Sequence, residues 1–361
     1  MTYEKMRITF LTPHLNVSGG VKAILEYASR LSERGHEVTV ICPQPALVEM
    51  RIRGRKVPTL LPKRAVMNML KRKPSWIDVA ADIKCVASWE EKHIPDGDIV
   101  VATAWQSAPY VRDYSSRKGR KIYLIQHYET LYHAPDNEEK ADETYSYNLR
   151  KIVISSWLKG IMREKFNSEA ELLVTPVNFN QFYPTRNGYN DKKRICMLHH
   201  FYSWKGVDDG IESFERAKKQ FPEIQLVMFG ANLRKVNTSY EYYYRPWGNE
   251  LREIYNSCDI FLCPSWREGL AMCSMEAMAC KCALVTTDNG GCGDYAIHEK
   301  TALVSPPRDA GKLAGNLIRL LENESKLRAV AHDGYEHVRR YTWDRAVDKM
   351  EGIFREELQE N

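Results

Sequence analysis

Two glutamates in residues 264–291 have a type and spacing suited to binding hydroxyl groups. Glu268 and Glu276 are eight positions apart, about two helical turns, so one helix spanning both would place them on one face. A carboxylate accepts two hydrogen bonds and suits a diol, so one glutamate could meet a sugar hydroxyl and the other a ribose diol. The structural alternative is a first-turn acid that balances the helix dipole, together with an exposed glutamate.

A phosphate position is predicted beside these glutamates. A strand is expected to end at Cys263, and a helix to open near residues 268–272, where free backbone N–H groups and the positive dipole end favour an anion. Lys205 precedes Gly206 at the start of another predicted helix. Its amine could neutralise the oxygens of a leaving diphosphate without a metal. A lone surface lysine is the alternative.

A glycine pair follows the first predicted strand. Gly19 and Gly20 come directly after Ser18 and precede a helical pattern over residues 21–31. Glycine has no Cβ atom, so the backbone there can approach a ligand closely. Because the pair is not part of a GxGxxG motif, it supports dinucleotide binding only weakly.

Two successive series of strands and helices are predicted to position these residues. The first comprises strand 7–12, helix 21–31 and strands 36–42, 99–103, 121–126 and 152–155. The second comprises strand 195–199, helix 206–220, strand 224–230, helix 250–257, strand 259–263, helix 268–280, strand 283–287 and helices 310–321, 324–341 and 343–359. Such alternation is typical of parallel sheets covered by helices. We predict an α/β protein with two Rossmann-like, doubly wound domains that face each other across a cleft.

The domain boundary is predicted in residues 176–193, which are rich in Asn, Pro, Gly and charge. A chain of 361 residues exceeds what one hydrophobic core usually organises, which favours two domains. We assign residues 1–178 to the first and 179–342 to the second. The spacing of the terminal helix, residues 343–361, leaves open whether it packs back on the first domain.

The composition is that of an ordinary soluble globular protein. Apolar residues make up 43% and charged residues 27%. No run approaches the roughly 18 apolar residues that span a bilayer, and residues 1–6 lack a signal-peptide core. We expect a cytoplasmic protein.

Neither the cysteines nor the one DxD sequence indicates a metal site. The nine cysteines form no CxxC pair and fall mostly in apolar segments, which is typical of reduced thiols that pack as small hydrophobic groups. Asp96 and Asp98 precede a strand and stand beside Pro95, which favours a turn. We expect neither a metal nor another cofactor.

Residues 51–73 are strongly basic, with nine Lys or Arg and no acid. One interpretation is a solvated loop and surface helix. The other is a docking surface for an anionic membrane or an acidic acceptor, since each basic residue near such a surface adds about 1 kcal/mol. That second reading would place the protein at the inner face of the membrane. No nucleic-acid recognition fold accompanies the charge.

Three segments together resemble a known family over nearly the whole chain. They are NVSGGVKAILEYASRLSERGHEVTVICP near the amino terminus, WKGVDDGIESF, and EGLAMCSMEAMACKCALVTT followed by DNGG. Their order resembles the retaining family 4 glycosyltransferases (glycosyl transferases group 1). The resemblance implies the two-domain GT-B fold.

The resemblance implies roles for the residues of the second domain. By position, Glu268 would face the donor sugar, Glu276 would hold the ribose, and Lys205 would hold the diphosphate. The amides of three following residues would cradle the distal phosphate and sugar: Gly269, Leu270 and Ala271.

It also implies roles for the first domain and one departure. Gly19 and Gly20 match the family's glycine loop, and His127 falls where the family often has a histidine beside the donor sugar. His200 stands where the family generally has an arginine that shares the diphosphate. Either Lys205 carries more of that load, or another base such as Arg234 or Arg245 substitutes.

The function implied is a metal-independent, retaining transfer of a hexosyl group. The donor would be a nucleotide diphosphate sugar and the acceptor a glycan, a lipid-linked molecule or a small molecule, in surface polysaccharide or glycoconjugate synthesis. One alternative is a nucleotide-sugar epimerase or hydrolase on the same fold, and another is a non-catalytic nucleotide-sugar binding protein. The base, sugar, acceptor, linkage and oligomeric state do not follow from the sequence.

Overall fold

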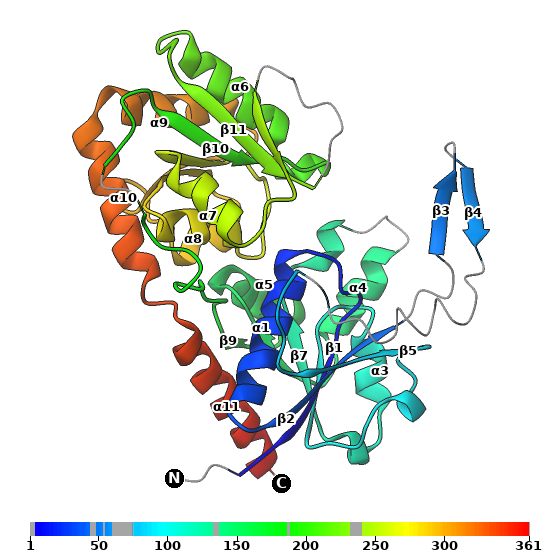
Figure 1. The fold of residues 1–361 in the computed structure, drawn as a ribbon. Coiled ribbons are helices and arrows are strands. Elements are labelled where there is room, and N and C mark those ends of the chain that lie inside the picture. The colour runs from blue at the N-terminus through cyan, green and yellow to red at the C-terminus, as the bar shows by residue number, and fades with distance from the viewer. Residues whose placement is uncertain are drawn as a thin grey trace. The chain divides into compact units, whose positions relative to one another are not determined.

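The computed structural model describes residues 4–43, 48–52, 55–59, 74, 76–132, 137–185, 188–231 and 240–360 (Figure 1). The chain forms two compact units. Unit 1 comprises Met1–Ile154, Lys159–Leu173 and Val347–Asn361, and unit 2 comprises Ser155–Leu158 and Val174–Ala346. The predicted boundary at 178 lies five residues from the change at 173, but neither unit is one continuous segment.

Unit 1 is built on a seven-stranded sheet in the order β5-β2-β1-β6-β7-β8-β9, with parallel neighbours throughout. Its strands are β1 (Arg7–Leu11), β2 (Glu37–Pro43), β5 (Asp82–Val86), β6 (Ile99–Ala102), β7 (Arg120–Ile125), β8 (Arg150–Val153) and β9 (Glu171–Leu172). Its α-helices include α1 (Gly19–Glu33), α3 (Ala108–Asp113), α4 (Glu138–Tyr145) and α5 (Ser156–Phe166), and its short 3-10 helices are η1 (Glu91–His93), η2 (Ser116–Lys118) and η3 (Glu129–Tyr132).

Unit 2 is built on a six-stranded sheet in the order β12-β11-β10-β13-β14-β15, again with parallel neighbours. Its strands are β10 (Arg194–Leu198), β11 (Gln225–Gly230), β12 (Glu241–Tyr244), β13 (Ile260–Cys263), β14 (Ala283–Thr287) and β15 (Ala302–Ser305). Its helices are η5 (Ser203–Lys205), α6 (Val207–Lys218), α7 (Asn249–Asn256), α8 (Met272–Ala279), η6 (Gly291–Asp294), α9 (Ala310–Glu322) and α10 (Glu324–Val338). The core packs α6, α9 and α10 on one face of the sheet through Phe214, Leu317 and Leu327.

Local sequence determines where helix α1, which contains the glycine pair, begins and ends. The Ser18 side chain caps the helix by accepting the N–H of Val21 at 3.3 Å, which satisfies one of the free donors of the first turn. Gly35 follows the helix with a φ of +95°, a conformation that glycine adopts without strain. Between them Ile24 and Leu25 are buried.

The last helix, α11 (Trp343–Gln359), begins in unit 2 and continues in unit 1 from Val347 onward. Within unit 1, Glu351 Oε1 lies 2.7 Å from Nε2 of His36, and Arg34 donates to Asp348 at 2.7 Å. Met350 and Phe354 on the same helix are fully buried. The terminal helix is therefore an integral part of the first compact unit.

Several elements differ from those expected. Strands β5, β9, β12 and β15 were not predicted. At the start of the basic segment, β3 (Val48–Ile52) and β4 (Arg55–Thr59) pair antiparallel. The prediction of a loop and helix was wrong for these strand residues. The side chains of residues 51–73 lie outside the described residues, so the predicted contact with an anionic membrane stays a prediction. None of the described helices is both long and apolar enough to cross a bilayer.

Each sheet has one place where the strand order reverses. In unit 1 the chain moves outward from β1 on one side and from β6 on the other, and in unit 2 it does so from β10 and β13. Open α/β sheets bind ligands beyond the carboxyl ends of their strands at such points. The loops that follow β1, β6, β10 and β13 are therefore the places to look for a site.

Candidate functional site

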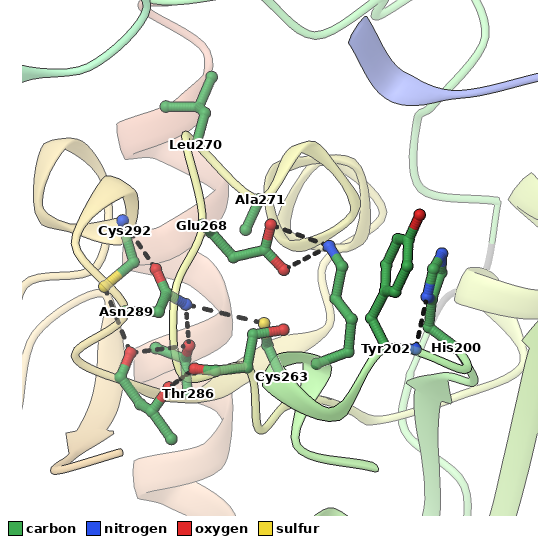
Figure 2. Close-up of polar contacts among 12 residues, drawn as sticks. His200, Tyr202, Cys263, Glu268, Leu270, Ala271, Thr286, Asn289 and Cys292 are labelled. Atoms are coloured by element: carbon green, nitrogen blue, oxygen red, sulfur yellow. Dashed lines mark hydrogen bonds and ion pairs between the residues drawn. The ribbon is translucent and has the colours of Figure 1, made fainter. Parts of the chain in front are cut away.

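Two charged side chains meet at the strand-order reversal of unit 2. Lys205 ends η5 in the loop after β10, and Glu268 lies in the loop after β13. The Lys205 amine donates to Oε1 of Glu268 at 2.7 Å and to Oε2 at 3.0 Å (Figure 2). Both side chains are largely shielded from water, with exposed fractions of 20% and 10%. The two residues that the sequence singled out independently thus form one ion pair.

Close backbone packing brings these two loops together. Gly206 has a φ of +61°, and a Cβ atom there would lie 2.1 Å from the carbonyl oxygen of Pro264, so no larger residue fits without a shift of the backbone. The N–H of Trp266 donates to the Trp204 carbonyl at 2.7 Å, and its indole Nε1 donates to Asp209 at 2.6 Å.

Lys205 supplies the positive charge of this ion pair. Burial lowers the pKa of the Lys205 amine, but the charge of Glu268 and its hydrogen bonds raise this pKa by more, so it lies above its usual value. Lys205 is therefore a permanent cation at neutral pH. An ammonium group has three N–H donors, and two of them point at Glu268. The third can donate to an anion that arrives beside the carboxylate.

His200, which stands at the expected arginine position, is neutral. Burial and the charge of Lys205 lower the pKa of its imidazole to about 4. Its Nδ1 accepts the N–H of Tyr202 at 3.2 Å (Figure 2), so in the neutral ring Nε2 carries the proton. His200 can donate one hydrogen bond but adds no charge.

Glu268 is not on a helix, which corrects the sequence prediction. Helix α8 begins at Met272, and the residue before it, Ala271, has left-handed dihedral angles with a φ of +59°. The backbone of Glu268 instead forms a bridge with Gly290, and its N–H donates to the Asn289 carbonyl at 2.8 Å. The proposed two-turn spacing of Glu268 and Glu276 on one helix face is therefore wrong.

Tyr295 and Gly291 contact the backbone between Glu268 and α8. Tyr295, which is fully buried, donates its hydroxyl to the carbonyl of Leu270 at 2.8 Å and also contacts that of Ala271. A Cβ atom on Gly291 would lie 2.3 Å from the Gly269 carbonyl oxygen. No side chain caps the amino terminus of α8, so the amides of its first turn can bind an anion.

Asn289 joins the loops after β13 and β14, and the sequence analysis did not single it out. Its side chain accepts the N–H of Cys292 at 3.1 Å and donates to the Thr286 hydroxyl at 3.4 Å (Figure 2). The side chain is buried. An asparagine in the DNGG turn was the only signal that could have indicated this role.

Glu276 lies on α8 and is buried. Its Oε2 accepts the hydroxyl of Tyr255 at 3.3 Å. The carboxylate is thus oriented from one side by a residue of α7.

In unit 1, the predicted residues gather at the carboxyl ends of β1 and β7. Gly20, in the first turn of α1, lies beside Gln126, and a Cβ atom there would lie 3.3 Å from the Gln126 side-chain oxygen. His127 follows directly, and its carbonyl accepts the Tyr145 hydroxyl at 3.4 Å. Gly19 is the first residue of the same helix.

Glu129 is a further titratable group at this end of the strands, and it was not among the predicted site residues. Its Oε2 accepts the N–H of Trp105, which follows β6, at 2.8 Å. Burial raises the pKa of this carboxyl to about 7, against the opposite effect of the hydrogen bonds from Trp105 and Tyr123. It therefore ties the loop after β6 to the loop after β7.

Of the two alternative bases, only Arg245 is among the described residues. Arg245 follows the edge strand β12, two strands from β10, and its guanidinium lies over the Tyr244 ring at 5.2 Å. Arg234 lies outside the described residues. In the DxD sequence, Asp96 pairs with Lys118 at 2.7 Å and Asp98 with Arg7 at 2.7 Å.

One cavity of 1010 Å³ lies at the amino-terminal ends of strands of the unit 1 sheet. Its lining includes Arg120 and Arg150, the first residues of β7 and β8, together with Glu357. Because open parallel sheets bind ligands at the carboxyl ends of their strands, we do not assign this cavity to the site.

The second half of the chain matches a known family. Residues 181–337 match the model described as glycosyl transferases group 1. These residues belong to that family. The group 1 domain so defined contains Lys205, Glu268 and Glu276, whereas Gly20 and His127 precede it.

Two curated relatives align over most of the chain. The O-antigen biosynthesis protein RfbC of Myxococcus xanthus is 26% identical over 354 residues, covering 94% of this chain and 26% of RfbC. The chain thus spans about a quarter of that relative. The N,N'-diacetylbacillosaminyl-diphospho-undecaprenol alpha-1,3-N-acetylgalactosaminyltransferase of Campylobacter jejuni is 25% identical, covering 82% of this chain and 85% of the relative.

A solved structure shares the fold of both units. HepE of Anabaena, in complex with UDP and glucose, superposes with a TM-score of 0.75 at 11% identity, over 97% of this chain and 100% of HepE. At this identity the likeness concerns the fold alone. The group 1 domain and the unit before it have the GT-B architecture, as predicted.

Proposed function

We propose that the protein transfers a hexosyl group from a nucleotide diphosphate sugar to a glycan, a lipid-linked molecule or a small-molecule acceptor. The observation that carries this proposal is the Lys205–Glu268 pair, 2.7 Å apart, beside the uncapped amino terminus of α8. A cation, free amides and a carboxylate together suit a ligand that has both phosphates and hydroxyl groups.

Cleavage of a sugar–phosphate bond leaves negative charge on the departing phosphate. Catalysis needs groups that bind this charge more strongly in the transition state than in the ground state. In our proposal Lys205 and the first amides of α8 do so, and the amides of Gly269, Leu270 and Ala271 hold the distal phosphate and sugar. Lys205 is a fixed charge because its pKa is raised.

The two glutamates bind hydroxyl groups in this scheme. Glu268 accepts hydrogen bonds from the donor sugar, and its contact with Lys205 holds its carboxylate beside the diphosphate. Glu276, oriented by Tyr255, accepts the ribose diol. His200 donates a single hydrogen bond to the diphosphate, so Lys205 carries the larger share of the counter-charge.

We further propose that the reaction needs no metal and retains the anomeric configuration. The carboxylates of the DxD sequence are paired with Lys118 and Arg7, which supports a purely cationic side-chain clamp. The acceptor would attack from the face that the phosphate leaves, with a phosphate oxygen taking its proton. Gly19, Gly20 and His127 of unit 1 would border the acceptor and the donor sugar.

The relatives support the substrate classes. The Campylobacter jejuni protein is named for transfer to a diphospho-undecaprenol lipid, and the Myxococcus xanthus protein for O-antigen biosynthesis. HepE was solved with UDP and glucose. We therefore favour a lipid-linked or growing surface glycan as the acceptor.

A donor panel tests the proposal. UDP, GDP, ADP and dTDP sugars are each incubated in EDTA, with and without a pool of glycan and lipid-linked acceptors, and free nucleotide is measured by mass spectrometry. We expect release from one donor that depends on acceptor. Release without acceptor would favour an epimerase or hydrolase, and no release from any donor would favour a binding protein.

A further inference from the structure

The first turn of α5 forms hydrogen bonds with the loop after β14. The N–H of Ser156 donates to Oδ2 of Asp294 at 2.8 Å, and its hydroxyl donates to Oδ1 at 2.6 Å. A carboxylate at a helix amino terminus is favoured by the helix dipole and by charge-assisted hydrogen bonds. Asp294 therefore serves as a cap that comes from a distant part of the chain.

The next residue, Trp157, packs directly on the backbone of this loop. A Cβ atom on Gly290 would lie 2.7 Å from Cδ2 and Cε2 of the indole. Only a residue without a side chain allows the ring this close, and the Gly290 φ of +89° also favours glycine. The ring thus presses against the peptide backbone with no side chain between them.

Gly290 is in turn the bridge partner of Glu268. The Glu268 N–H donates to the Asn289 carbonyl at 2.8 Å, and the Glu268 carbonyl accepts the N–H of Gly291 at 3.1 Å. One strand-like layer of backbone therefore separates the Trp157 ring from the residue whose carboxylate meets Lys205.

The far end of the loop is anchored from another side. The Asp294 carbonyl accepts the hydroxyl of Tyr341 at 2.6 Å and lies 3.1 Å from Nε2 of His337. Asp294 therefore has its carbonyl fixed by the region of α10 and its carboxylate fixed by α5. The loop after β14 is therefore held by Trp157 at Gly290 and by contacts on two sides of Asp294.

Helix α5 itself is divided between the two units. Its first turn lies in Ser155–Leu158 of unit 2, and its remainder lies in Lys159–Leu173 of unit 1.

We propose that Ser156 and Trp157 are positioning residues that hold Glu268 and the three amides after it in place against Lys205. They do not touch the donor but set where its sugar and distal phosphate bind. This inference rests on the proposed function of the Lys205–Glu268 site.

Hydrogen–deuterium exchange tests the positioning without any need for turnover. Ser156→Ala and Trp157→Ala are compared with the wild type, with Trp157→Phe as the conservative variant. Lys159→Ala, at an exposed residue two positions after Trp157, is the matched control. We expect exchange in peptides covering residues 266–272 to rise severalfold in the first two variants, with β13 unchanged. Trp157→Phe should restore most of the protection. Unchanged exchange in these peptides would overturn the inference.

Kinetics then connect the position of the loop to chemistry. With the donor that the wild type uses, Trp157→Ala should lower kcat about tenfold or more while the acceptor KM stays within about twofold. Trp157→Phe should recover most of kcat, and Lys159→Ala should match the wild type. If the wild type is active and Trp157→Ala has the same kcat, the inference is contradicted. A wild type that releases nothing would instead contradict the proposed function, while the exchange result still decides the positioning.

Discussion

Lys205 and Glu268 are 63 residues apart in the chain, yet the amine of one donates to both carboxylate oxygens of the other. They meet because β10 and β13 are neighbours at the strand-order reversal of unit 2. Neither residue is held by its own helix. Their contact depends on loop packing, through Gly206 on one side and Gly290 on the other.

Loss of either member of this pair should abolish most of the activity. We expect Lys205→Ala and Glu268→Ala each to lower turnover at least a hundredfold, equivalent to about 2.7 kcal/mol of transition-state stabilisation. Steady-state rates with the donor found in the panel measure this, and circular dichroism checks the fold. Lys312→Ala, an exposed lysine of α9, should match the wild type. Near-normal turnover in either site variant would remove that residue from the mechanism.

A permanent charge at the His200 position should tighten donor binding. The imidazole is neutral because its pKa is lowered to about 4, whereas an arginine would add a charge-assisted hydrogen bond to the diphosphate. We expect His200→Arg to lower the donor KM by about three- to tenfold at constant ionic strength. His332→Arg, at an exposed position of α10, provides the control for added charge. An unchanged or raised KM would mean that His200 does not face the diphosphate.

Glu129 should make unit 1 less stable as the pH rises. Its pKa is raised from 4.5 to about 7, so the folded state binds the proton more tightly than the unfolded state does. The free energy of unfolding therefore falls as the pH rises from about 4.5 to about 7. Glu129→Gln keeps an acceptor for the Trp105 N–H without the charge. We expect it to raise the free energy of unfolding at pH 8 by on the order of 2 kcal/mol and to change it little at pH 4.

Denaturant unfolding at both pH values measures this difference. Glu139→Gln, an exposed residue of α4, should show no such pH dependence. If the two glutamine variants behave alike, the Glu129 carboxyl titrates normally.

Glu351 should have the opposite pH dependence. Burial raises the pKa of its carboxyl, but hydrogen bonds with His36 and Arg34 lower it by more, so it lies below 4.5. Such a group stabilises the fold above its unfolded pKa, and this stability is lost as the pH falls through the folded pKa.

We expect Glu351→Gln to lower the free energy of unfolding at pH 7 by about 1 to 2 kcal/mol, with a smaller effect below pH 4.5. Glu356→Gln changes a more exposed ion pair of the same helix and should cost less than about 0.5 kcal/mol. Equal effects of the two variants would show that the contact with His36 adds nothing.

The sequence predicted the strands that carry clear apolar runs, and it missed those that do not. Strands β1, β7, β11 and β14 lie within a residue of their expected bounds. Strand β12 has the sequence EYYY and β9 has two residues, so neither has an alternation that distinguishes it from a loop. Their strand character comes from pairing with a neighbour that the local sequence does not specify.

The site residues were predictable by type but not by geometry. The segment from Glu268 to Met272 contains good helix formers, which favoured a helix from Glu268 onward. The backbone of Glu268 pairs instead with residues 289–291, a tertiary contact that overrides local preference. Trp157 likewise has no local feature that indicates its contact with Gly290, because that contact depends on how α5 meets the loop.

Because each unit is made of separate segments, parts of this chain cannot be exchanged with those of a similar protein at one point. A chimaera joined at a single point near residue 178 would separate Ser156 from Asp294 and His36 from Glu351, since each pair has one partner on either side of that point. A recombinant that keeps its native pairs must draw residues 155–158 and 174–346 from one parent and the remainder from the other. Specificity swaps in this chain therefore require four junctions rather than one.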